Sequence, residues 1–202
     1  MKREVMNCLL CNAPLNEMIT WKTLLTNAYP KTICQDCENK FEPYPPTGEE
    51  EVIALYQYNE AMKDYLHRYK FMHDVVLAKV FRDQIHKTLT KKDATIVPIP
   101  MHPVKLKERT FAHVDELLKA SNINFEHFLD KITMETQGEK TREERITTPQ
   151  IFKLKVSPDK MKDQNILLVD DIYTTGTTIS HAKNLLLEAG ANSVKAFTLI
   201  RV

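Results

Sequence analysis

The sequence predicts an α/β protein in which an open, mostly parallel sheet is flanked by helices and preceded by a small four-cysteine segment. Three observations predict this architecture. Strand-like and helix-like segments alternate from residue 52 onward. A run of four apolar residues at 166–169 is typical of a central strand that is covered on both faces. All the cysteines lie within the first 37 residues.

The expected sheet domain begins with a strand at 52–58, followed by a segment of helical composition at 60–71. Apolar residues at three- and four-residue steps predict a second helix over 75–88, with one face in the core. They are Leu77, Val80, Phe81 and Ile85. A strand at 94–100 contains two prolines. Because proline cannot donate to a sheet ladder, they indicate a strand end or the start of an irregular loop.

Leu117 and Leu118 mark another helix, and the apolar residues between 125 and 132 indicate a buried segment of undetermined type. Residues 133–149 are polar and charged without apolar periodicity, so we expect them to be mobile.

The last elements predict a crossover unit, in which two parallel strands are joined by a helix. The strands are expected at 166–169 and 194–200, and the helix at 177–189. Gly190 is the residue type that most often ends a helix.

The cysteines form two pairs with the same spacing, Cys8 with Cys11 and Cys34 with Cys37. Each pair can grip one side of a tetrahedral Zn²⁺, so the spacing favours one structural zinc ion in a closed four-sulfur site. Disulfides and a catalytic thiol pair are the alternatives. We expect a zinc-finger domain over 1–42, a linker over 43–50 and the sheet domain over 51–202, because a proline-rich turn follows the cysteines.

Composition excludes several classes of protein. The net charge of +1 and pI of about 7.7 give no global basic face for nucleic acid. No apolar run approaches the roughly 18 residues that span a bilayer, and no signal peptide precedes the cysteines, so we expect a cytoplasmic protein. None of the four glycines belongs to a dinucleotide-binding or P-loop motif.

Two carboxylates and a hydroxyl-rich turn follow the apolar run at 166–169. Asp170 and Asp171 are suited to ribose hydroxyls or hydrated Mg²⁺, since ionised carboxylates only accept hydrogen bonds. The turn precedes a helix N-terminus, where unpaired N–H groups favour a phosphate. Its residues are Thr174, Thr175, Gly176, Thr177 and Thr178. The pattern predicts a site for a phosphorylated sugar, and a solvated turn with a helix cap is the alternative.

Three cations follow the strand at 94–100, namely Lys105, Lys107 and Arg109. On a loop at the carboxyl end of that strand they could bind a diphosphate, and a solvated basic turn is the alternative. His102 and His113 flank this segment and are expected to make local hydrogen bonds.

The segment 166–178 resembles the 5-phosphoribosyl 1-pyrophosphate (PRPP) motif of type I phosphoribosyltransferases. The resemblance implies that the acids hold the ribose hydroxyls, that the threonine-rich loop wraps the 5′-phosphate, and that the basic segment faces pyrophosphate and Mg²⁺. The order of motifs along the whole chain, with the cysteine pairs, resembles the ComF family of competence proteins, of the ComFC type. Lys70 matches that family's Lys-aromatic pair, which implies a role in PRPP binding.

The ComF resemblance includes Gln137, Arg142, Arg145 and Phe152. Where the family usually has Arg-Gly-Phe-Asn, this chain has Arg109-Thr110-Phe111-Ala112, so Thr110 replaces the glycine and Ala112 replaces the asparagine. Since a β-branched residue disfavours positive φ, we expect an altered pyrophosphate loop. Ile146 and Thr147 also stand where the family tends to place an asparagine.

Three functions are compatible with these patterns. The first, implied by the resemblance, is a protein needed for uptake of transforming DNA that binds PRPP or a related compound and works with a helicase-like competence ATPase. The second is an active phosphoribosyltransferase in nucleotide salvage. The third is a zinc-finger module that contacts single-stranded DNA directly, with basic side chains on phosphates and aromatic side chains on bases. Otherwise we expect any association with single-stranded DNA to be indirect or weak.

Overall fold

The computed structural model describes residues 5–15, 29–45, 51–132 and 150–202. The segment expected to be mobile, 133–149, lies outside these residues. The same holds for Gln137, Arg142 and Arg145, so their predicted roles stay predictions.

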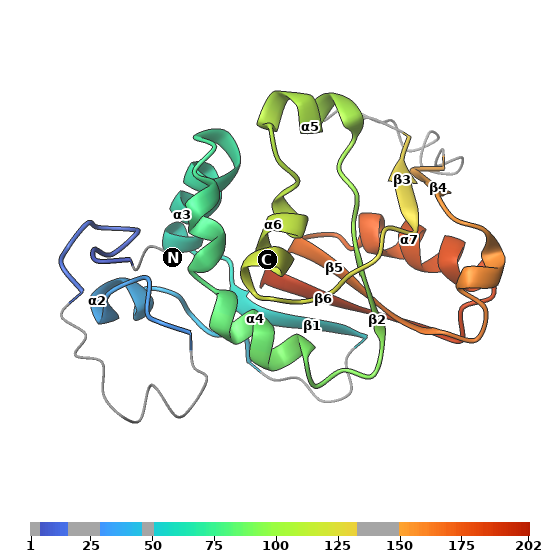
Figure 1. Cartoon of the computed structure of the whole chain (residues 1–202), viewed down its shortest axis with the longest axis horizontal. Coiled ribbons are helices and arrows are strands. Elements are labelled where there is room, and N and C mark those ends of the chain that lie inside the picture. Colours follow the sequence, from blue (N-terminus) through green and yellow to red (C-terminus); the bar gives the residue numbers. More distant parts are fainter. Residues whose placement is uncertain (1–4, 16–28, 46–50, 133–149) are drawn as a thin grey trace.

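A four-stranded parallel sheet forms the centre of the molecule, in the order β1-β6-β5-β2 (Figure 1). The strands are β1 (Val52–Gln57), β2 (Thr95–Pro98), β5 (Asn165–Tyr173) and β6 (Ser193–Arg201). Parallel strands need crossover connections, and helices supply them here. The predicted α/β fold with an open, mostly parallel sheet is confirmed.

Six helices of α type and two short 3-10 helices connect the strands in the described part of the chain. They are α2 (Gln35–Glu38), α3 (Glu60–Phe71), η1 (Val75–Lys79), α4 (Arg82–Leu89), α5 (Pro103–Arg109), α6 (His113–Ala120), η2 (Pro158–Lys160) and α7 (Thr177–Glu188). None of them combines the length and apolar character that crossing a bilayer requires.

The two faces of the sheet carry separate apolar cores. One face packs against α3, η1, α4, α6 and the cysteine segment, and receives Leu167 and Val169 of β5. The opposite face packs against α7, and receives Ile166 and Leu168. Because successive side chains of a strand point to opposite faces, the residues of β5 alternate between the two cores.

The single helix predicted over 75–88 is wrong, because the structure divides it into η1 and α4. The division aims Phe81 into an aromatic cluster. Its ring centroid lies 4.9 Å from those of Phe41, Tyr56 and Tyr65. Such edge-to-face and tilted contacts add to the area that the rings bury. The apolar spacing therefore located the core face correctly but not the break.

A small antiparallel hairpin covers the α7 side of the molecule. It consists of β3 (Leu129–Lys131) and β4 (Phe152–Leu154), paired from Leu129 with Leu154 to Lys131 with Phe152. These strands resolve the buried segment whose type the sequence left open. They were hard to predict because each has only three residues.

The cysteine segment is docked on the sheet domain. Phe41 belongs to the same core as α3 and α4, and the backbone around residue 43 pairs with β1 through Tyr56. Arg68 of α3 donates hydrogen bonds to the carbonyl groups of Leu9 and Leu10, both 3.0 Å long. The boundaries predicted for the finger, linker and sheet domain stay predictions.

Candidate functional site

The acid pair lies inside β5, since the strand continues to Tyr173 instead of ending at residue 169 as predicted. Asp170 is in register with Thr198 of β6. Alternation along the strand places Asp170 on the α7 face and Asp171 on the α3 and α6 face. The two carboxylates therefore have different surroundings, which their adjacency in the sequence did not indicate.

Asp171 is buried and already has a cationic partner. The Lys70 Nζ lies 2.6 Å from the Asp171 Oδ2, and their side chains are 14% and 10% exposed. His113 Nδ1 lies 4.0 Å from the same oxygen. A charged pair at this depth is costly to break, because removing one partner leaves an unpaired buried charge.

His113 also belongs to the site, although the sequence analysis did not place it there. Its Nδ1 lies 3.2 Å from a nitrogen of Arg109, and since guanidinium only donates, the imidazole nitrogen accepts. Burial lowers the pKa of His113 to about 4, so the ring is neutral at pH 7. The buried Nε2 has no hydrogen-bond partner among the described residues.

Asp170 is less buried than Asp171 and accepts a hydrogen bond of 2.8 Å from the backbone N–H of Asp171. Burial and the nearby charge of Asp171 raise the pKa of Asp170 to about 7, although Lys70 and Lys131 act in the opposite direction. At neutral pH this carboxyl can exchange its proton for a hydrogen-bond donor or a cation.

The threonine-rich turn connects β5 to the N-terminus of α7. Gly176 is the N-cap of α7 and has φ of 77°, a left-handed conformation that glycine adopts without strain. A Cβ at this position would overlap the hydroxyl of Tyr173. The hydroxyls of Thr175 and Thr177 are 3.0 Å apart, and both side chains are exposed. An anion at this turn would meet hydroxyls and the first N–H groups of a 12-residue helix.

Tyr173 makes a cation–π contact with Arg201 at the end of the sheet. The guanidinium carbon of Arg201 lies 5.2 Å from the centroid of the Tyr173 ring and 5.1 Å from that of Tyr44. The backbone N–H of Val202 donates to the carbonyl of Tyr173 at 3.0 Å. These contacts hold the Tyr173 ring against Gly176, so the ring limits the space on one side of the turn.

The basic segment is the helix α5, not a loop as predicted. Pro103 stands at its first turn and the His102 ring accepts from the N–H of Val104, which confirms a local hydrogen-bonding role for His102. Thr110 ends the helix with φ of 65°. The expectation that a β-branched residue would avoid positive φ here is wrong.

The three cations of α5 are not equivalent. Arg109 faces the site, since its guanidinium carbon lies 5.0 Å from the centroid of Phe71 and it contacts His113. Lys105 and Lys107 have no hydrogen-bond or ion-pair partner in the described ranges. Figure 1 shows α5 beyond the end of β2, across from the end of α3. The structure thus brings Lys70 and Arg109 together, and their predicted contacts with PRPP stay predictions.

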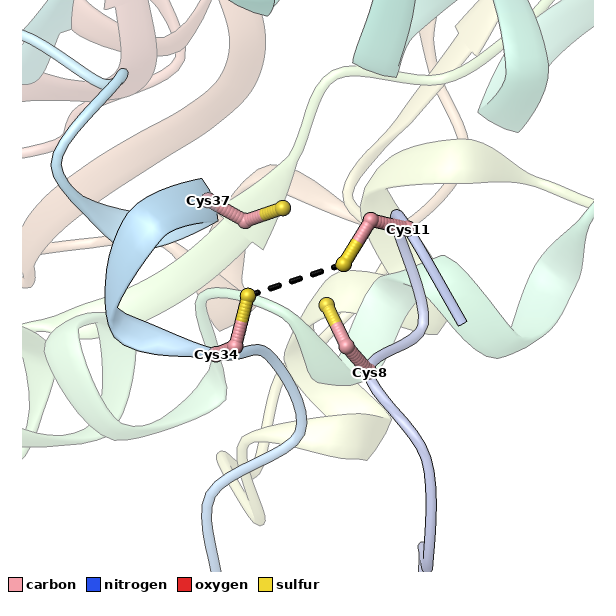
Figure 2. A group of neighbouring side chains, drawn as sticks. All are labelled: Cys8, Cys11, Cys34 and Cys37. Atoms are coloured by element: carbon pink, nitrogen blue, oxygen red, sulfur yellow. Dashed lines mark hydrogen bonds between the residues drawn. The ribbon is translucent and has the colours of Figure 1, made fainter. Parts of the chain in front are cut away.

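The four cysteines converge from two segments of the chain. Figure 2 shows the thiols of Cys8 and Cys11 facing those of Cys34 and Cys37. Their sulfur atoms all lie within 4.8 Å of one another, and those of Cys11 and Cys34 are 3.6 Å apart. No disulfide joins them.

The geometry of the thiols fits a tetrahedral metal site. Bonds of about 2.3 Å from zinc to sulfur place neighbouring sulfurs about 3.8 Å apart. Burial opposes ionisation of Cys8, yet hydrogen bonds from the backbone N–H groups of Cys11, Cys34 and Leu10 lower its pKa to about 6. The four thiols could hold a metal ion such as zinc, and no open position would remain for chemistry.

Comparison with known proteins identifies the family of this chain. Residues 77–202 match the phosphoribosyl transferase domain family. The chain is 35% identical to competence protein ComFC of Streptococcus pneumoniae over 97% of this chain and 100% of that protein. The chain belongs to the ComF family of competence proteins. It is also 29% identical to competence protein ComFC of Bacillus subtilis, over 96% of this chain and 94% of that one.

A hypoxanthine phosphoribosyltransferase of Staphylococcus aureus is similar in structure, with a TM-score of 0.42 and 19% identity over 71% of this chain and 73% of that chain. The predicted family, ComFC type with a phosphoribosyltransferase-like sheet and an N-terminal four-cysteine site, is confirmed.

Proposed function

We propose that this ComF protein acts in the uptake of transforming DNA, and that its acid pair and threonine-rich turn bind PRPP or a related phosphoribosyl compound. One observation carries the binding proposal. Asp170 and the Gly176 turn lie on the same side of the sheet, with the hydroxyls of Thr175 and Thr177 exposed at the N-terminus of α7. We call Asp170, Asp171 and residues 174–178 the cradle.

Each part of the cradle suits one part of the ligand. The 5′-phosphate would meet Thr174 to Thr178 and the free N–H groups of α7, because an anion is stabilised by a helix N-terminus. The ribose hydroxyls would donate to the carboxylate of Asp170. The pyrophosphate would face Arg109, Lys105 and Lys107 of α5. Mg²⁺ bound with the ligand would neutralise pyrophosphate charge.

A titration tests the binding proposal. PRPP with Mg²⁺ is titrated calorimetrically into the intact protein and into the double variant Asp170→Ala/Asp171→Ala. We expect saturable binding by the intact protein and loss of most affinity in the variant. An unchanged affinity in the folded variant would contradict the assignment of the acids.

The competence proposal follows from the two relatives named competence protein ComFC. We propose that the partner is a helicase-like ATPase of the uptake machinery, with the four-cysteine segment as its docking surface. Deleting the gene in a competent host should lower transformation frequency strongly. A deletion strain that takes up and integrates DNA at the parental frequency would refute the competence role.

An active phosphoribosyltransferase is the second candidate, favoured by the family match over residues 77–202. The test is release of pyrophosphate from PRPP and Mg²⁺ with a panel of purine, pyrimidine and amine acceptors. Release above the rate without acceptor would support it, and no release with any acceptor would count against it. Direct contact with single-stranded DNA stays a prediction from the sequence.

A further inference from the structure

We propose that Lys70 is a positioning residue, which holds Asp171 in place and leaves Asp170 as the only one of the two acids that contacts the ligand. This inference rests on the proposed function, since the ligand is the same phosphoribosyl compound. It changes the expectation for two residues. Lys70 would act through Asp171 and not by touching pyrophosphate, and Asp171 would support Asp170 from the opposite face of the sheet.

The first support is the direction of the two carboxylates. Residues 166 and 168 of β5 pack on the side of α7, and residues 167 and 169 pack on the side of α3 and α6. The carboxylate of Asp171 contacts Lys70 of α3, so the alternation continues as far as Asp171 and Asp170 lies on the α7 side. After Asp171 the alternation ends, since Ile172 also packs on the side of α3 and α6. Only Asp170 lies on the face from which α7 and the Gly176 turn rise.

The second support is that Asp171 already has its partners. Its Oδ2 lies 2.6 Å from the ammonium of Lys70 and 4.0 Å from the ring of His113. Both Asp171 and His113 are buried, and Arg109 lies 3.2 Å from the same ring nitrogen, Nδ1, that faces Asp171. A ligand that displaced Lys70 would leave an ammonium group without its carboxylate in a poorly solvated place, which is unfavourable.

The third support is that Lys70 itself is held firmly. The hydroxyl of Tyr69 donates to the carbonyl of His113 at 2.7 Å, which fixes the last turn of α3 against the start of α6. Two residues before Lys70, Arg68 donates to the carbonyls of Leu9 and Leu10 and pairs with Asp74 at 3.1 Å. The part of α3 just before Lys70 is therefore anchored on both α6 and the cysteine segment.

The experiment compares two ligands that differ only in pyrophosphate. PRPP and ribose 5-phosphate are each titrated into the wild type, Lys70→Met, Lys70→Arg, Asp171→Asn and the double variant Lys70→Met/Asp171→Asn. Lys63→Met is the matched control, because Lys63 lies on the same helix, is 57% exposed and pairs only with Glu60 in the described residues. Melting curves confirm that each variant is folded at the titration temperature.

We expect Lys70→Met to weaken binding of both ligands by the same factor, about tenfold, which corresponds to one charge-assisted hydrogen bond. Lys70→Arg should keep part of the affinity. The double variant should bind no more weakly than Lys70→Met, since it leaves no orphaned charge. Lys63→Met should bind like the wild type.

Three results would overturn the inference. Weaker binding of PRPP alone would mean that Lys70 contacts pyrophosphate. Tighter binding of ribose 5-phosphate by Lys70→Met would mean that Asp171 is itself a ligand group that Lys70 competes for. Unchanged affinity for both ligands, in a folded variant, would mean that the ion pair only stabilises the fold. A wild type that binds neither ligand would refute the proposed function together with this inference.

Discussion

Gly176 in the cradle and Thr110 at the end of α5 both have a left-handed backbone conformation, with φ of 77° and 65°. Glycine is suited to this conformation and a β-branched residue is not. The two positions should therefore respond to substitution in opposite directions.

Gly176→Ala should lower the free energy of unfolding by about 2 kcal/mol and weaken ribose 5-phosphate binding, because the new methyl group overlaps Tyr173 in addition to straining the backbone. Gly190→Ala is the control. Gly190 has φ of 100°, but its nearest neighbour to an added Cβ is 3.9 Å away, so only backbone strain is expected there. Denaturant unfolding and calorimetry measure both effects. Equal losses in the two variants would contradict the limit that the Tyr173 ring places on the turn.

Thr110→Gly should raise the free energy of unfolding by about 1 kcal/mol, because it relieves a left-handed β-branched residue at the end of α5. Asn122→Gly provides the comparison. Asn122 has φ of 52°, which asparagine tolerates, so its gain should be smaller. Denaturant unfolding of both variants would show this. A loss of stability in Thr110→Gly would mean that the threonine side chain makes a compensating contact.

The pKa of Asp170 gives a pH dependence of definite sign. The pKa of Asp170 in the folded protein, about 7, is above the ordinary aspartate value of 3.8. The folded state therefore binds more protons than the unfolded state between these values, and Asp170 makes stability fall as pH rises from about 4 to 7. Asp170→Asn should remove this contribution. The free energy of unfolding of the wild type minus that of the variant should decrease over this interval, and a constant difference would contradict the raised pKa.

Individual residues differed in how far the sequence could predict them. The cysteine pairs lie where their spacing indicated, because a short turn in each pair brings its two thiols close to those of the other pair. The pairing of Lys70 with Asp171 was not predictable, since it depends on how α3 packs across β5. His113 gave no signal beyond its place next to the basic segment.

At the level of the elements, α3 connects the cysteine segment to the sheet domain. Arg68 contacts the first cysteine turn through two backbone carbonyls, and the same helix carries Lys70 toward the cradle. A structural change at the four cysteines should therefore affect the position of α3 first.

Arg68→Met should lower the free energy of unfolding by about 2–3 kcal/mol, since it removes charge-assisted hydrogen bonds to Leu9 and Leu10 and leaves Asp74 unpaired. It should also speed the loss of metal to a chelator. Lys63→Met again serves as the control on α3. If the variant released metal at the wild-type rate, Arg68 would not hold the cysteine turn.

The types of α3, α7, β1 and β6 were predicted correctly from the composition and order of their segments. The length of β5 and the break between η1 and α4 were not predicted. The acids of β5 interrupt its apolar pattern, although the backbone stays paired with β6 through Tyr173. The basic residues of α5 suggested a loop, but Pro103 at the first turn and a capping His102 allow a short helix.

One of the two cores of the molecule, on the side of α3 and α6, also includes residues of the cysteine segment. Cys8, Ile33, Cys37 and Phe41 belong to the same apolar cluster as α3 and α6. The metal site and the sheet domain should therefore unfold together, because breaking one exposes the core of the other.

Metal analysis of the purified protein should give about one zinc ion per chain. Cys37→Ser should lose the metal and lower the melting temperature of the entire protein, since Cys37 is buried in the shared core. Cys11→Ser should also lose metal but destabilise less, because Cys11 is exposed. Retention of a full zinc content by either variant would contradict a four-thiol site.

The central claim is that the edge of the sheet at Asp170 and the Gly176 turn binds an activated pentose phosphate. The most direct test is a crystal structure of the protein with PRPP and Mg²⁺. We predict the 5′-phosphate at the N-terminus of α7 and the ribose hydroxyls on Asp170, with Lys70 still paired to Asp171. Density for the ligand at any other place, with this turn empty at saturating PRPP, would contradict the account.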